Sequence, residues 1–186
     1  MVKETRIMKL DDLASPSYRA QLHQMHSDSD WGKRGQQHIS SFITFFYDLG
    51  CKTLLDYGCG KGTMRPVLHQ IDASIDVRLF DPGHEPVSAL PEPADFVTAL
   101  SCIENIEPEL VDNVLSHIHS LTLKGAYLAI TIRSSNPKKP TYLPDGRDEH
   151  LSVHPPAWWL KKLSHYDWHI HKHELHKKAV RVWLRK

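Results

Sequence analysis

One acid and three glycines carry the strongest chemical signal in the sequence. The stretch Leu54-Leu55-Asp56-Tyr57-Gly58-Cys59-Gly60-Lys61-Gly62 passes from two apolar residues through an acid into glycines at alternate positions. Glycine reaches positive φ and has no side chain, so the backbone of such a loop can approach a ligand closely. Nucleotides bind at strand-to-helix loops of this kind in open α/β sheets. The motif therefore predicts a nucleotide-binding turn after a buried strand.

The elements around this loop follow from hydrophobic periodicity. We expect helices to begin near Ser15 and Pro108, with an amphipathic helix from Ile39 to Leu49. Further helices are predicted after the glycine loop and after Pro155. The predicted strands are 53–57, 75–80, 94–100 and 126–132, followed by a hairpin of 166–175 and 179–185. Alternating strands and helices imply an α/β fold with a mostly parallel sheet, helices on both faces and a C-terminal antiparallel hairpin.

Length and composition indicate one ordinary globular domain. The chain has 186 residues, 40% hydrophobic and 24% charged, and we expect a single domain over 1–186. A formal net charge of +1 does not direct the whole chain to nucleic acid or membrane. The three cysteines are widely spaced and predict free thiols in a reducing compartment, so we expect a cytoplasmic protein. No apolar run is long enough to span a membrane, so we expect no membrane partner.

Histidines are numerous near the C-terminus. His169, His171 and His173 alternate along a predicted strand, which would put three imidazoles on one face. Residues two apart in a strand are roughly 7 Å from each other, so a straight strand does not chelate one ion with all three. We therefore expect no metal site there.

The order of elements resembles the class I S-adenosylmethionine-dependent methyltransferases, a Rossmann-like family with a closing hairpin. The residues from Leu54 to Gly62 are similar to that family's first motif. Asp95-Phe96-Val97 through Ile106 resembles its fourth-motif strand and turn, and Gly125 to Ile130 resembles its fifth strand. The resemblance covers roughly two-thirds of the chain and implies S-adenosylmethionine as cofactor, with S-adenosylhomocysteine as product.

Two departures from the family pattern stand out. Asp95 comes only 14 positions after Asp81, too few for the usual helix, third strand and loop. We therefore expect a sheet that lacks the usual third strand, with the adenine pocket built by other residues. No Asn/Asp-Pro-Pro-aromatic sequence follows the Asp95 strand, which weakens methylation of an exocyclic base nitrogen or an amide nitrogen.

The resemblance implies a set of cofactor-binding residues. The glycine turn would face the methionine part of the cofactor, and Asp81 would bind the ribose hydroxyls; the alternative for Asp81 is a simple Asp-Pro-Gly turn. Trp31 and Arg34 belong to a segment that, within 1–50, would cover the cofactor and its carboxylate, or would simply be a solvated loop. The full predicted set is Asp56, Gly58, Cys59, Gly60, Gly62, Asp81, Ser101, Cys102, Trp31 and Arg34.

Three residues are candidates for the catalytic side. Glu104 stands where relatives often carry an acid facing the transferred methyl, although an acid also suits a helix N-terminus. The loop 134–153 is long, as functional loops often are, and we interpret it as a substrate-side loop. Within it His150 is a candidate base and Arg147 a candidate anion clamp; the alternative is an ordinary charged, solvated loop.

We therefore predict an S-adenosylmethionine-dependent methyltransferase whose acceptor is unidentified and more plausibly a small molecule than a nucleic-acid base. One alternative is a catalytically silent S-adenosylmethionine-binding or interaction protein. A further alternative is an RNA or DNA methyltransferase, for which a local basic patch would bind phosphates. The candidate patch residues are Lys138, Lys139, Arg147, Lys161 and Lys162.

Overall fold

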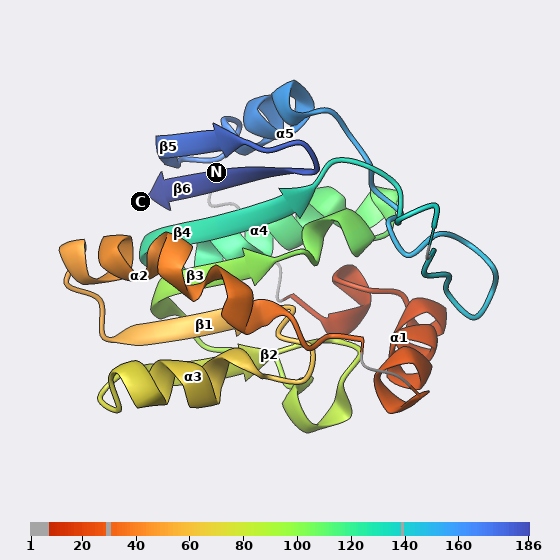
Figure 1. Cartoon of the computed structure of the whole chain (residues 1–186), viewed down its shortest axis with the longest axis horizontal. Helices are drawn as coiled ribbons and strands as arrows, with labels where there is room; N and C mark the ends of the chain where they lie inside the picture. The colour runs from red at the N-terminus through yellow and green to blue at the C-terminus, as the bar shows by residue number, and fades with distance from the viewer. Residues whose placement is uncertain (1–7, 29–30, 139) are drawn as a thin grey trace, which may run out of the picture.

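A six-stranded sheet forms the centre of the computed structural model, which describes residues 8–28, 31–138 and 140–186 (Figure 1). Its strand order is β2-β1-β3-β4-β6-β5. Strands β1 to β4 are parallel, whereas β6 is antiparallel to both β4 and β5. The strands are β1 (Thr53–Tyr57), β2 (Asp76–Phe80), β3 (Ala94–Leu100), β4 (Thr122–Thr131), β5 (His169–Leu175) and β6 (Ala179–Arg185).

Helices cover both faces of this sheet, so the predicted fold class is confirmed. The α-helices are α1 (Pro16–Asp28), α2 (Ile39–Asp48), α3 (Met64–Ile71), α4 (Val111–Leu121) and α5 (Pro156–Leu163). Short 3-10 turns are η1 (Leu10–Asp12), η2 (Gly35–His38), η3 (Glu85–Val87), η4 (Ile103–Asn105) and η5 (Pro108–Leu110). None of the helices in the described ranges is long and apolar enough to cross a membrane.

Two apolar cores lie on opposite faces of the sheet. Phe42 and Phe46 of α2 pack with Leu54 and Phe96 on one face, where α3 also contributes. On the other face α4 and α5 pack against Leu55 and its neighbours in β3 and β4. Burying each such large side chain contributes about 1.5–3 kcal/mol. Strands buried on both faces read as nearly continuous apolar runs, which is why β1 and β3 were recognisable in the sequence.

The sheet ends one strand early beyond β2. Strand β2 has β1 as its neighbour in the sheet, and the segment 81–93 contains only the turn η3. The predicted loss of the usual third strand is therefore confirmed. Helix α1 packs beside this end of the sheet: a Cβ on Gly83 would lie 2.3 Å from the Cβ of Leu22. Helix α2, in contrast, covers a sheet face rather than the strand ends.

The fourth strand begins earlier than its predicted start at Ala126. Strand β4 starts at Thr122 and contains Gly125 as a paired residue. A Cβ at Gly125 would lie 2.5 Å from Leu49 and 3.0 Å from the Leu184 carbonyl oxygen. The glycine is therefore a close-packing position inside the strand and not a turn before it.

The interpretation that three histidines share one face of β5 is wrong. The pairing of β5 with β6 shifts between Ile170 and Lys172, so a β-bulge interrupts the alternation. His171 stacks on Phe45 of α2, with ring centroids 4.9 Å apart. His173 pairs with Val182, which belongs to the core on the opposite face. No group of three or more metal-ligating side chains occurs among the residues described.

Candidate functional site

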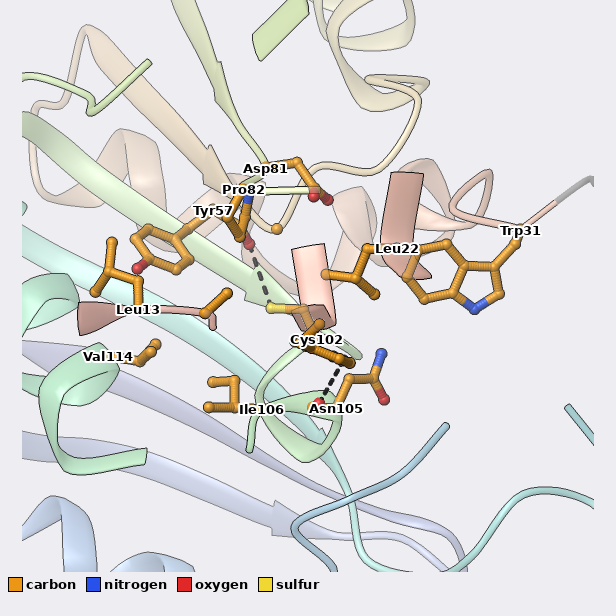
Figure 2. A pocket seen from close by; sticks show the side chains of 13 residues that line it. Leu13, Leu22, Trp31, Tyr57, Asp81, Pro82, Cys102, Asn105, Ile106 and Val114 are labelled. Carbon is orange, nitrogen blue, oxygen red and sulfur yellow. Dashed lines mark hydrogen bonds between the residues drawn. The ribbon is translucent and has the colours of Figure 1, made fainter. Parts of the chain in front are cut away.

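A cavity lies at the carboxyl ends of β1, β2 and β3, where parallel strands bring their following loops together. Tyr57, Asp81 and Cys102 line it from these strand ends, and Tyr18 and Leu22 line it from α1. Figure 2 shows Asp81 and Pro82 on one side of this cavity and Val114 of α4 on the other. Open α/β sheets place ligands at this edge. The sequence therefore brings its acidic and glycine motifs to the position expected of a binding site.

The glycine loop adopts the predicted tight geometry. Gly58 and Gly60 have φ values of 70° and 55°, a region that favours glycine. A Cβ on Gly58 would lie 2.6 Å from Cys102, and one on Gly60 would lie 2.4 Å from the Gly32 oxygen. The loop is thus close-packed by the chain's own backbone, because the segment around Gly32 covers it. The Lys61 amide donates to that same Gly32 carbonyl at 2.9 Å.

Asp81 is the polar centre of the edge beside β2. Its side chain is buried, and its two oxygens accept hydrogen bonds from the Gly60 and Gly83 amides, both at 2.9 Å. These bonds tie the loop after β1 to the loop after β2. Each carboxylate oxygen has a second lone pair that these amides do not use. Asp81 is therefore a fixed acceptor group that can still receive hydrogen bonds from a ligand.

Asp56 lies deeper, near the end of β1. Thr98 donates to its Oδ1 at 3.1 Å, whereas its Oδ2 has no hydrogen-bond partner. Burial raises the pKa of Asp56 to about 7, with the negative charge of Asp81 adding to the effect. The Oδ2 atom faces Gly35, whose Cβ would lie 3.7 Å away. Asp56 thus links the glycine loop to the segment that precedes α2.

Ser101 and Cys102 follow β3 and complete the strand-end loops. Ser101 has a φ of 50°, a strained value for a residue with a side chain and one that often marks functional positions. The Cys102 thiol donates to the Tyr57 carbonyl at 3.3 Å. Burial raises the pKa of both the Cys59 and the Cys102 thiols, so neither has the thiolate character of a nucleophile.

The segment before α2 reaches across the site to the loop 134–153. The Trp31 indole lines the cavity and donates to Glu149 at 2.7 Å. Arg34 comes directly before η2, and its side chain is exposed. Trp31 is therefore brought together with Asp81 and the glycine loop, whereas the Arg34 side chain faces solvent.

Glu104 and His150 form a second polar group, next to the end of β4. Glu104 is completely buried, and neither carboxyl oxygen has a partner in good hydrogen-bond geometry, although Thr131 lies close to it. Burial raises its pKa, and the nearby Thr131 and His150 oppose this effect. His150 Nδ1 lies 2.8 Å from the Arg133 carbonyl oxygen. Since a carbonyl only accepts, Nδ1 carries the hydrogen and neutral His150 holds its lone pair at Nε2, 3.7 Å from Glu149.

Arg147 lies apart from this group. Its guanidinium forms an ion pair with Asp145 in the same loop at 2.8 Å, which holds the pKa of Asp145 down at about 2. Lys162 is similarly paired with Asp112, again at 2.8 Å. Lys139 lies outside the described residues. Two cations of the candidate phosphate-binding patch are therefore already neutralised by neighbouring acids.

Sequence reasoning missed four site residues, Tyr18, Leu22, His26 and Asn105. Tyr18 donates its hydroxyl to the Asn105 carbonyl, and the Asn105 side chain leaves a buried oxygen without a partner. His26 lies 3.6 Å from Asp81. Tyr18, Leu22 and His26 recur every four residues, so their common helical face was a readable signal. The role of this helical face could not be predicted from the sequence, because only the fold shows that the face meets the loop after β2.

Unpaired buried polar atoms concentrate at this edge. Ten such side-chain atoms occur in the described residues, and six of them belong to four site residues. His26 and Glu104 contribute two atoms each, and Asp56 and Asn105 one each. Buried polar groups normally have partners, so a cluster without them indicates a place where a polar ligand binds. The residues present therefore fit a polar cofactor bound at this edge.

Comparisons with known proteins agree with this geometry. A family model described as "Methyltransferase domain" matches residues 14–181. Among solved structures, magnesium protoporphyrin IX methyltransferase (ChlM) from Synechocystis PCC 6803 with bound SAH is similar at 17% identity and a TM-score of 0.57, covering 89% of this chain and 93% of that one. The methyltransferase domain of bacterial CtHen1 gives 12% identity and a TM-score of 0.58 over 81% of this chain and 98% of that one.

The mitomycin 7-O-methyltransferase MmcR is similar at 11% identity and a TM-score of 0.55, covering 92% of this chain and 54% of that one. A search of curated proteins found no significant match. The family model spans most of the sequence, including the glycine loop and most of the closing hairpin. The chain therefore belongs to the methyltransferase-domain family and has the fold of the class I S-adenosylmethionine-dependent methyltransferases.

Proposed function

We propose that this methyltransferase transfers a methyl group from S-adenosylmethionine to a small-molecule acceptor bound beside Trp31 and the loop 134–153. The observation that carries the proposal is the group of buried, unpaired polar atoms of His26, Asp56, Glu104 and Asn105. Such groups are costly to bury without partners, at about 1–3 kcal/mol each. A bound cofactor and acceptor would supply those partners.

The chain's own residues divide into cofactor and acceptor sides. S-adenosylmethionine supplies a methyl group already activated on a sulfonium, so the protein's main task is to hold donor and acceptor in line. Asp81 would accept hydrogen bonds from the ribose hydroxyls. The loop of Gly58 and Gly60 would lie against the methionine part, and Ser101 and Cys102 would border the ligand from the end of β3.

The adenine ring would occupy the cavity under α1. The missing third strand removes the wall that usually closes this pocket. Here Leu22 of α1 and Pro82 after Asp81 line the cavity instead, and Asn105 lies at its edge with an unpaired Oδ1. That oxygen is a suitable acceptor for an exocyclic amino group. Helix α1 thus takes the place of the lost strand.

The acceptor side has a candidate base. His150 is held by the Arg133 carbonyl in the tautomer that leaves Nε2 free to take a proton. Glu149 lies beside Nε2 and would stabilise the imidazolium that forms. Glu104 would orient the acceptor by receiving a hydrogen bond from it. Arg147, paired with Asp145, would act only if that ion pair opened.

A small acceptor is favoured over a nucleic acid. Two similar structures are named for methylating compact molecules, a magnesium porphyrin and mitomycin. In addition, Lys162 and Arg147 are engaged with acids and do not offer an open phosphate-binding patch.

Transfer of a labelled methyl group tests the proposal. The purified protein is incubated with S-[methyl-³H]adenosylmethionine and with separate small-molecule, nucleic-acid and protein fractions of a cell extract. We expect label in the small-molecule fraction, and loss of that label in a His150→Gln variant that still binds S-adenosylhomocysteine. Label confined to nucleic acid would contradict the acceptor class, and no transfer to any fraction by a protein that binds the cofactor would favour a silent binding protein.

A further inference from the structure

Arg181 is a half-buried cation near the start of β6, where it lies opposite Ala129 of β4. Its guanidinium forms no ion pair or hydrogen bond with the other residues that the structure describes. Glu174 of β5 faces Arg181 across the strands. That carboxylate is held instead by Lys172 at 2.7 Å and lies 3.3 Å from His176. The charge of Arg181 is therefore left to attract another anion.

The strand register brings Arg181 close to the proposed acceptor side. Thr131 of β4 pairs with Ala179, two residues before Arg181, so Thr131 and Arg181 are diagonal neighbours on one face of the sheet. Diagonal neighbours of this kind are roughly 7–8 Å apart. Glu104, which we propose to orient the acceptor, lies close to Thr131. A small molecule that contacts Glu104 therefore needs to extend only about this far to contact Arg181.

Two polar side chains without partners lie beside Arg181. His38 of η2 has an unpaired Nδ1, and the fully buried Tyr127 has a hydroxyl with no partner in good geometry, although Ser41 is close. The two rings are 6.3 Å apart. Burial lowers the pKa of His38 and raises that of Tyr127, and the positive charge of Arg181 acts on both. Buried polar groups normally have partners, so this pair marks a polar region that a ligand would complete.

The surrounding hairpin is strongly basic. Residues 168–186 contain six lysines and arginines but one acid, Glu174. Lys177 and Lys178 are exposed in the turn between β5 and β6, and the Lys178 carbonyl accepts from the Ile132 amide at 3.0 Å. This turn lies at the same end of the sheet as α1 and the loop 134–153 (Figure 1). The edge that carries the candidate site therefore has a positive field that favours an anionic ligand.

We propose that Arg181 binds an anionic group, a carboxylate or a phosphate, of the methyl acceptor, which is therefore an anionic small molecule. The planar guanidinium donates two parallel hydrogen bonds to either group. Arg147, the anion clamp predicted from the sequence, is already paired with Asp145, whereas Arg181 has no such partner. The inference rests on the proposed function, since it names the chemical class of the acceptor.

Fractionation of the acceptors by charge tests the inference. The small-molecule fraction of a cell extract is split at neutral pH on an anion-exchange resin, and each part is incubated with the protein and S-[methyl-³H]adenosylmethionine. We expect label in acceptors from the retained part. If phosphatase treatment of that part abolishes labelling, the anion is a phosphate; if labelling persists, it is a carboxylate. Label confined to acceptors from the unretained part would overturn the inference.

Substitutions on β6 test the role of Arg181 itself. Arg181→Gln should raise the half-saturating concentration of the retained acceptors roughly ten- to hundredfold, equivalent to about 1.5–3 kcal/mol, and leave the affinity for S-adenosylhomocysteine unchanged. Arg181→Lys keeps the charge and should recover part of the loss. Arg185→Gln removes an exposed arginine opposite Gly125, far from the candidate site on the same strand, and should change neither quantity.

Three results for the variants would overturn the inference. These are an unchanged half-saturating concentration in Arg181→Gln, the same increase in Arg185→Gln, or an equal loss of affinity for S-adenosylhomocysteine in Arg181→Gln. Absence of label in both parts of the small-molecule fraction would instead contradict the proposed function.

Discussion

Gly60 illustrates how one residue joins the glycine loop to the segment that covers it. Its φ of 55° suits glycine, and a Cβ there would collide with the backbone of Gly32. The sequence predicted the turn correctly, because alternate glycines directly after a buried strand are typical of a tight strand-to-helix turn. It did not predict that the close approach is made by the chain's own segment around Gly32, since that contact depends on tertiary folding.

A Gly60→Ala substitution should therefore destabilise the folded protein more than the same change at Gly50. Gly50 has a φ of 60° and nothing within 4 Å of a Cβ, so it reports the backbone cost alone, about 1–2 kcal/mol. At Gly60 the clash should add roughly 1–3 kcal/mol. Urea unfolding of both variants measures the difference, and equal losses would show that Gly32 does not confine the loop.

The buried Asp56 predicts a pH dependence of stability. Its ordinary pKa of 3.8 rises to about 7 in the folded protein, so the folded state holds the proton more tightly than the unfolded chain. The extra free energy of unfolding that this bound proton provides is present at low pH. It is lost as the pH rises from about 4 to about 7, by up to about 1.4 kcal/mol per pH unit.

Asp56→Asn cannot titrate and should lack this decline. The measurement is the difference in unfolding free energy between the two proteins across that pH range. Parallel stability curves would mean that Asp56 ionises as freely in the folded protein as in the unfolded chain.

At the scale of elements, α1 has the least predictable role. Its start at Pro16 and its apolar face were readable from the cap and the spacing of Tyr18 and Leu22. Its position was not readable, because nothing local in α1 encodes a contact with Gly83 some sixty residues later. The bulge in β5 was missed for a similar reason: alternating residues suggest a regular strand, and only pairing with β6 exposes the shift at His171.

Leu22→Ala tests whether α1 forms part of the ligand cavity. Leu22 is buried and lines that cavity, so its truncation should cost about 2 kcal/mol or more of stability and weaken S-adenosylhomocysteine binding several-fold. Leu175→Ala, the same change at a side chain that is 63% exposed, is the matched control and should change neither. Thermal unfolding and calorimetry on both variants provide the readouts; equal affinities would remove α1 from the site.

At the scale of the whole molecule, the parallel sheet and its closing hairpin were predictable. The absence of the strand that the family usually has beyond β2 was predictable as well. Buried parallel strands are continuous apolar runs, and the short distance from Asp81 to Asp95 leaves no room for another βα unit. Asp56 and Asp81, which we propose for the cofactor side, follow from that frame, because they lie at the ends of neighbouring strands. The proposed acceptor side was less predictable, since Glu104 and His150 come near each other through the long loop after β4.

Calorimetric titration with S-adenosylhomocysteine tests the central claim most directly. Wild-type protein should bind it, and bound ligand should raise the unfolding temperature by mass action. Asp81→Asn keeps one acceptor oxygen, for either the Gly60 or the Gly83 amide, and replaces the other oxygen by an NH2 group. It should bind about tenfold or more weakly, because a hydrogen bond to a charged group is worth about 1.5–3 kcal/mol. No heat of binding and no thermal shift with wild-type protein, or identical affinity in Asp81→Asn, would contradict the assignment of this edge as the cofactor site.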